Sequence, residues 1–173
     1  LPGLQIVVPA ANAGCRAAID ALLAHPRFST LDVRVLDGQA RAAMVASDVV
    51  LLASGTATLE ALLAKRPMVV GYRIAPSTAF LVRLFKLMRV DRFSLPNVLA
   101  GRTIAPEFMQ EDCTPEHLSA AVLHWFRDPA AADALRPVYR DLHLQLRQGA
   151  SAIAADAVAR LAVPALPASA RTP

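Results

Sequence analysis

The middle of the chain reads Asp48-Val49-Val50-Leu51-Leu52-Ala53-Ser54-Gly55-Thr56-Ala57-Thr58-Leu59-Glu60-Ala61. The run after Asp48 is apolar and of strand length, which is typical of a strand buried in a parallel sheet. The residues after Thr56 are good helix formers, and Pro67 ends the helix that they predict. Small residues at the turn leave backbone amides free at the helix N-terminus, where Gly55 lets a phosphate approach closely. The stretch therefore predicts a strand-turn-helix unit suited to bind a phosphate.

Hydroxyl and carboxylate groups surround this turn. Ser54 and Thr56 place side-chain hydroxyls beside the amides that a phosphate would meet. Glu60 lies one helical turn beyond Thr56, and its carboxylate is suited to accept hydrogen bonds from the vicinal hydroxyls of a ribose. Two plainer interpretations stay open, in which the hydroxyls only cap the helix and Glu60 only faces solvent.

Further strands and helices alternate on both sides of this unit. The sequence predicts strands at residues 5–9, 33–36 and 67–72, with helices at 13–23 and 40–46 between them. Such alternation indicates right-handed βαβ units and an α/β fold with a Rossmann-like parallel sheet flanked by helices. Ligands of these sheets bind at the carboxyl ends of the strands, so we expect Tyr72 and Arg73 beside the Ser54 turn.

A second polar segment reads Ser94-Leu95-Pro96-Asn97-Val98-Leu99-Ala100-Gly101-Arg102. Pro96 restricts the residue before it, and we expect the bend that it makes to present Asn97 at a fixed angle. The amide of Asn97 carries donors and an acceptor that suit a uracil edge or a diphosphate oxygen. The competing interpretation is a turn asparagine that bonds its own backbone.

A basic amphipathic helix is predicted from residue 77 to about 90. Phe80 belongs to its apolar side, and Arg83, Lys86 and Arg89 supply its charge. Either this is an ordinary surface helix with a solvated cationic face, or these residues meet an anionic membrane surface.

Composition excludes several classes of protein. The 173 residues are 55% hydrophobic, which indicates a folded domain, yet no apolar run is long enough to cross a bilayer. The net charge is +4, but dispersed arginines and 5% aromatic residues are poor material for binding nucleic acid. The two cysteines and four histidines show no ligand spacing, so we expect neither a metal nor a cofactor. Glu107, Glu111 and Asp112 are interpreted as a solvated acidic stretch.

Three regions follow from these patterns. Residues 1–128 form a Rossmann-like domain that is incomplete at its N-terminus, and residues 129–162 form C-terminal helices. A helix over 114–126, capped by Thr114 and opened by Pro115, closes the first region. Residues 163–173 carry three prolines among small residues and are predicted to be disordered.

The two polar segments, joined by Pro67-Met68-Val69-Val70-Gly71-Tyr72-Arg73, resemble lipid-A-disaccharide synthases. The similarity covers nearly the whole chain, including Ile6-Val7-Val8-Pro9 and Ala43-Met44-Val45-Ala46-Ser47-Asp48. It implies a GT-B-type hexosyltransferase of lipid A biosynthesis, a pathway of Gram-negative bacteria. The chain looks like the C-terminal, donor-binding half of such an enzyme.

The resemblance also implies a reaction and a set of binding residues. Such an enzyme transfers 2,3-diacylglucosamine from its UDP donor to 2,3-diacylglucosamine 1-phosphate (lipid X), at the cytoplasmic face of the inner membrane. Carried over to this sequence, Asn97 contacts UDP and Glu60 takes the ribose hydroxyls. Ser54, Gly55 and Thr56 cradle the diphosphate, with positive charge from Arg73 or Arg102.

The resemblance leaves part of the enzyme unaccounted for. The acceptor domain and an upstream Pro-Gly-Ser-Arg loop do not appear in the sequence, so the catalytic residues are expected outside the chain. We expect the chain alone to bind UDP weakly at most and not to turn over. C-terminal helices left without a partner favour homo-oligomers. Two alternatives stay open: an enzyme resembling UDP-N-acetylglucosamine 2-epimerase, and a non-catalytic module that binds nucleotide sugars.

Overall fold

The computed structural model describes residues 1, 3–74 and 92–162 of the chain. The predicted amphipathic helix with Phe80, Arg83, Lys86 and Arg89 lies outside the described residues, as does the predicted disordered tail. Within them, no helix is both long and apolar enough to cross a membrane.

Helices and strands alternate through the first half, as the sequence predicts. The order is β1 (Ile6–Ala10), α1 (Ala13–Leu23), β2 (Val33–Asp37), α2 (Ala40–Ala46), β3 (Val50–Leu52), α3 (Thr56–Leu63) and β4 (Met68–Tyr72). The second half holds α5 (Leu95–Ala100), β5 (Glu107–Met109), α6 (Pro115–Arg127), α7 (Pro129–Leu146) and α8 (Ala150–Ala162). Short 3-10 turns occupy Pro26–Phe28 and Gln110–Asp112. The expected α/β fold with parallel strands and flanking helices is confirmed.

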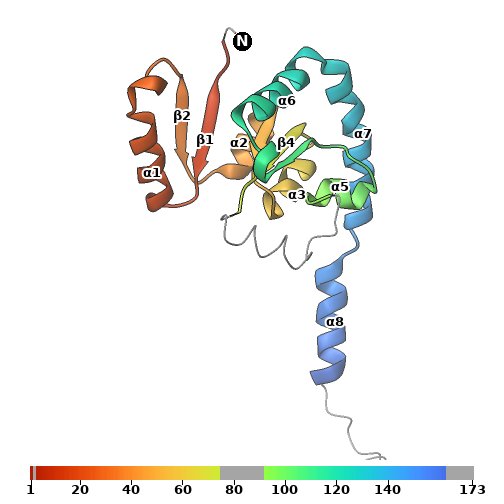
Figure 1. Cartoon of the computed structure of the whole chain (residues 1–173). Helices are drawn as coiled ribbons and strands as arrows, with labels where there is room; N and C mark the ends of the chain where they lie inside the picture. The colour runs from red at the N-terminus through yellow and green to blue at the C-terminus, as the bar shows by residue number, and fades with distance from the viewer. Residues whose placement is uncertain (2, 75–91, 163–173) are drawn as a thin grey trace, which may run out of the picture.

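The strands form two sheets where the sequence predicts one. β1 pairs with β2, and β4 lies between β3 and β5, with every pair parallel. In the part of the chain that the structure describes, no ladder joins β1 to β3. Figure 1 shows the β1–β2 pair beside the larger sheet, with α2 leading from one to the other.

Two local predictions are corrected. The Ser94–Arg102 segment was expected to bend, but Leu95–Ala100 form a short helix with Pro96 in its first turn. This helix ends at Gly101, whose φ of 64° suits a glycine. Glu107 begins a strand instead of lying in a solvated acidic stretch, because its neighbours continue the larger sheet.

The core lies against the larger sheet. Residues of β3, β4, α3, α6 and α7 bury their apolar side chains there, including Leu62, Met68, Trp125 and Tyr139. The Tyr139 hydroxyl is buried without a hydrogen-bond partner among the described residues, and this burial raises the pKa of Tyr139. By contrast, β1, α1 and β2 bury only Ala10. Helix α8 is exposed along its length and projects away from the rest of the chain (Figure 1).

Candidate functional site

The turn between β3 and α3 lies at the carboxyl edge of the larger sheet. Gly55 stands at the cap position with a φ of 141°, and no side chain caps α3. Thr56 is exposed at the first helical position, while the buried Thr58 hydroxyl donates 2.7 Å to the Gly55 carbonyl. The interpretation of this turn as a plain Ser or Thr cap is therefore wrong. The amides at the start of α3 keep no side-chain acceptor among the described residues, as a phosphate site requires.

The two polar segments of the sequence meet at this edge. The Ser54 hydroxyl donates to the Phe93 carbonyl over 3.3 Å, across 39 positions of sequence. This bond joins the β3–α3 turn to the residues that lead into α5. The larger sheet thus brings Ser54, Gly55 and Thr56 beside the Ser94–Asn97 segment.

A carboxylate from β5 holds the second segment in place. Glu107 accepts hydrogen bonds from the backbone amides of Phe93 and Ser94, at 2.8 and 2.9 Å. It also accepts from the Ser94 hydroxyl and from the Asn97 side-chain amide. Ser94 and Asn97 are buried, with 0% and 1% of their surface exposed, so Glu107 satisfies donors that water does not reach.

Asn97 has further bonds within the protein. Its Nδ2 donates 2.7 Å to the Ala105 carbonyl, and its Oδ1 accepts from the amides of Ile104 and Ala105 at 2.6 and 2.9 Å. The side chain thereby fixes the turn that leads into β5. A direct contact with UDP would require the amide to exchange one of these bonds for the nucleotide.

Residues after β4 complete the edge. Tyr72 and Arg73 are exposed there, as expected from the strand that precedes them. Gln110, at a φ of 47°, accepts a 2.8 Å hydrogen bond from the Ile74 amide through its Oε1. The residue that follows β5 thus fixes the chain just beyond Arg73.

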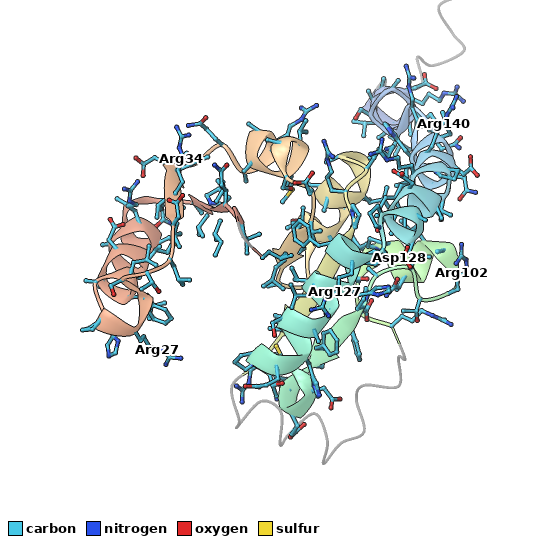
Figure 2. The ribbon with its side chains drawn as sticks, turned by 90° about the horizontal axis from the view of Figure 1, so that it is seen from above. Arg27, Arg34, Arg102, Arg127, Asp128 and Arg140 are labelled. Atoms are coloured by element: carbon cyan, nitrogen blue, oxygen red, sulfur yellow. The ribbon has the colours of Figure 1, made fainter. Side chains whose placement is uncertain are left out.

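Glu60 and Arg102 are less closely associated with the others. Both side chains are exposed, and among the described residues no hydrogen bond ties either one to the Ser54 turn. Arg102 follows α5, so that helix separates it from Ser94, and Figure 2 shows Arg102 at the periphery of the molecule. The described ranges hold no group of three His, Cys, Asp or Glu side chains that could bind a metal ion.

Sequence reasoning missed Glu107, Gln110 and Phe93. The sequence does carry an indication of the role of Glu107. Its carboxylate is the single charged group in the otherwise apolar run Ile104-Ala105-Pro106-Glu107-Phe108-Met109. An ionised group in such a run is expected to have buried partners. Phe93 contributes its backbone carbonyl and amide, and the identity of a side chain does not indicate which groups the backbone bonds to.

Comparison with known proteins identifies the family. The family model described as lipid-A-disaccharide synthetase matches residues 1–161. The lipid-A-disaccharide synthase of Xanthomonas axonopodis pv. citri (strain 306) is 56% identical over 161 residues, which are 93% of this chain and 37% of that protein. That of Xylella fastidiosa (strain M12) is 52% identical over 93% of this chain and 42% of its own length. The chain thus spans about two fifths of these relatives, and it belongs to the lipid-A-disaccharide synthase family.

Proposed function

We propose that this chain is the donor-binding part of a lipid-A-disaccharide synthase. The donor is UDP-2,3-diacylglucosamine, the acceptor is lipid X, and the products are lipid A disaccharide 1-phosphate and UDP. The observation that carries the assignment is the bond from Ser54 to Phe93, since it brings both polar segments to one edge of a parallel sheet.

Each group at this edge has a task in the proposal. The uncapped amides of α3, with the Ser54 and Thr56 hydroxyls, bind the diphosphate beside Gly55. The same donors stabilise the charge that develops on the diphosphate as UDP leaves. Arg73 adds positive charge, and Tyr72 borders the diphosphate.

The remaining residues bind the nucleoside. Glu60 accepts hydrogen bonds from the ribose hydroxyls, from its exposed position on α3. Asn97 contacts UDP by exchanging one of its present bonds, and Arg102 approaches the diphosphate from beyond α5. The catalytic residues lie in the rest of the enzyme, so the chain alone does not turn over.

The acylated substrates place the reaction at a lipid surface. We propose that the enzyme is peripheral at the cytoplasmic face of the inner membrane, with Phe80, Arg83, Lys86 and Arg89 toward anionic lipid. Helix α8 exposes Ile153, Val158 and Leu161 at 64%, 64% and 88%, an apolar face available for homo-oligomers.

Calorimetric titration with UDP tests the assignment of the site. Thr56→Val removes an exposed hydroxyl without changing side-chain shape, and Thr30→Val is the matched control on an exposed loop. A hydrogen bond to a charged group contributes about 1.5–3 kcal/mol, so we expect Thr56→Val to weaken UDP binding by about tenfold or more. Asn97→Ala should weaken it as well, and Thr30→Val should leave it unchanged.

Two results would contradict the proposal. If UDP binds saturably and both site variants retain the affinity, the nucleotide site lies elsewhere. Robust sugar transfer by the purified 173-residue chain would show that it is more than the donor-binding part. If the chain binds no UDP, the same variants are compared in the full-length enzyme by their KM for the donor.

A further inference from the structure

Helix α5 presents an apolar stripe beside the candidate site. Leu95, Val98 and Leu99 follow the i, i+3, i+4 spacing of one helix face, and they are 38%, 54% and 40% exposed. Pro96 and Asn97 lie on the opposite face and are buried. This short helix thus turns three large apolar side chains toward solvent while its other face is packed.

Hydrogen bonds on the buried face of α5 keep the stripe turned outward. The Asn97 side chain bonds to the backbone of Ile104 and Ala105. Its amide also donates to the Glu107 carboxylate. Helices α3 and α7 contact α5 as well, as Figure 1 shows. Rotation of α5 to bury the stripe would leave these polar groups unpaired, so the stripe stays on the surface of the described part of the chain.

The stripe begins next to the turn that follows β3. The Phe93 carbonyl accepts the hydrogen bond from Ser54, and Leu95 follows Ser94 as the first residue of α5. Arg102 is exposed beyond the other end of the helix. A ligand bound by the turn at Ser54 therefore has an apolar surface close beside it.

We propose that the stripe of Leu95, Val98 and Leu99 binds an acyl chain of the sugar-nucleotide donor. This step rests on the proposed function, because the donor proposed above carries acyl groups at positions 2 and 3 of its glucosamine. Position 2 is bonded to the carbon that bears the diphosphate, so a chain attached there starts beside the diphosphate turn. Contact with α5 removes apolar surface from water both on the chain and on the three side chains.

The size and charge of the stripe favour an acyl chain over other occupants. The six residues of α5 span about 9 Å, a length that part of a fatty-acyl chain covers. A stable protein interface buries roughly 800 Å² on each partner, which is more than three partly exposed side chains offer. An anionic membrane attracts clusters of basic residues, whereas the residues of α5 carry no charge.

The donor selectivity of the full-length enzyme tests the proposal. Two substrates are compared, UDP-2,3-diacylglucosamine and the analogue that carries acetyl groups in place of the acyl chains. The measured quantity is kcat/KM for the acylated donor divided by kcat/KM for the acetylated donor. A variant that is partly unfolded loses activity toward both donors equally, so this ratio reports contact with the chains.

Three pairs of substitutions separate the stripe from general effects. Val98→Thr with Leu99→Gln makes the stripe polar and should lower the ratio by about fivefold or more. Val98→Ile with Leu99→Met keeps the stripe apolar and should retain the ratio. Val45→Thr with Leu22→Gln is the matched control, because Val45 on α2 is 50% exposed and Leu22 on α1 is 63% exposed. The control pair should leave the ratio unchanged.

Three outcomes overturn the proposal. The polar pair keeps the wild-type ratio, or the control pair lowers the ratio as much as the polar pair does, or the polar pair abolishes sedimentation of the enzyme with anionic vesicles that contain no substrate. The last of these would assign the stripe to the membrane. Failure of the proposed function is a different result, because the full-length enzyme then transfers sugar from neither donor, and the inference fails with it.

Discussion

Replacing Glu107 should destabilise the fold more than its position in a short strand suggests. In Glu107→Ala, the Ser94 amide and hydroxyl lose their acceptor while Ser94 stays buried. The Phe93 amide loses its acceptor too, and the Nδ2 of Asn97 keeps only its bond to the Ala105 carbonyl. A buried donor left without a partner costs about 1–3 kcal/mol.

The size of the loss follows from the exposure of these groups. Glu107 and Phe93 are half-buried, so water can reach part of the vacated space, and relief of the buried carboxylate offsets part of the cost. We therefore expect Glu107→Ala to reduce the free energy of unfolding by about 3 kcal/mol. Glu107→Gln keeps one acceptor oxygen but turns its NH₂ group toward one of the donors. We therefore expect it to reduce the free energy of unfolding by about 1–2 kcal/mol, less than Glu107→Ala.

Urea denaturation followed by circular dichroism measures both losses. Asp141→Ala, at an exposed position within α7, is the matched control and should change the free energy by less than about 0.5 kcal/mol. Amide exchange at Phe93 and Ser94 should accelerate in Glu107→Ala, because these amides lose their bonds to the carboxylate. If Glu107→Ala behaves like Asp141→Ala, the carboxylate does not hold the Phe93–Asn97 segment in place.

Three further changes probe the core and the backbone. Tyr139→Phe removes the buried hydroxyl that lacks a partner, and it should stabilise the fold by about 1 kcal/mol in urea denaturation at pH 7. Burial raises the pKa of Tyr139, so the unfolded chain releases this proton first and stability should fall as pH rises above about 10. That decline should weaken in Tyr139→Phe and persist in Tyr72→Phe, and an equal decline in both variants would contradict the assignment. Gly71→Ala places a Cβ 3.0 Å from the Leu118 side chain. We expect thermal melts to show that the free energy of unfolding falls by about 1–3 kcal/mol, and that Leu118→Ala in the same chain partly relieves this loss. Additive losses in the double variant would refute the contact. Gln39 has a φ of 60°, which a glycine adopts more readily. In the same melts, Gln39→Gly should raise the free energy of unfolding by about 0.5–1 kcal/mol. An equal rise in Gln39→Ala would exclude backbone strain as the cause.

Local signals in the sequence predicted many of the elements well. The helices at 13–23 and 40–46 have the predicted bounds. Thr114 caps α6 through a 3.2 Å bond from the His117 amide, and Pro115 opens that helix, as expected. These features depend on residues within a few positions of one another, which is the range that propensity and capping describe.

The parts that sequence reasoning missed depend on contacts between distant segments. Glu107 was interpreted as solvated because its chain neighbours include other acidic residues, yet its partners lie 10 to 14 positions earlier. The strand that holds it is three residues long and offers little period-2 pattern to recognise. For Asn97, the sequence left ligand contact and backbone contact open, and the structure shows its bonds to the backbone of Ile104 and Ala105.

The larger sheet and the β1–β2 pair differ in how firmly the chain holds them. The turn after β3 and the residues before α5 rest on a sheet covered by the main core, and Ser54, Phe93 and Glu107 join them by hydrogen bonds. The β1–β2 unit buries only Ala10 and has no such core of its own. The Ser54 turn therefore rests on packing that the β1–α1 turn does not share.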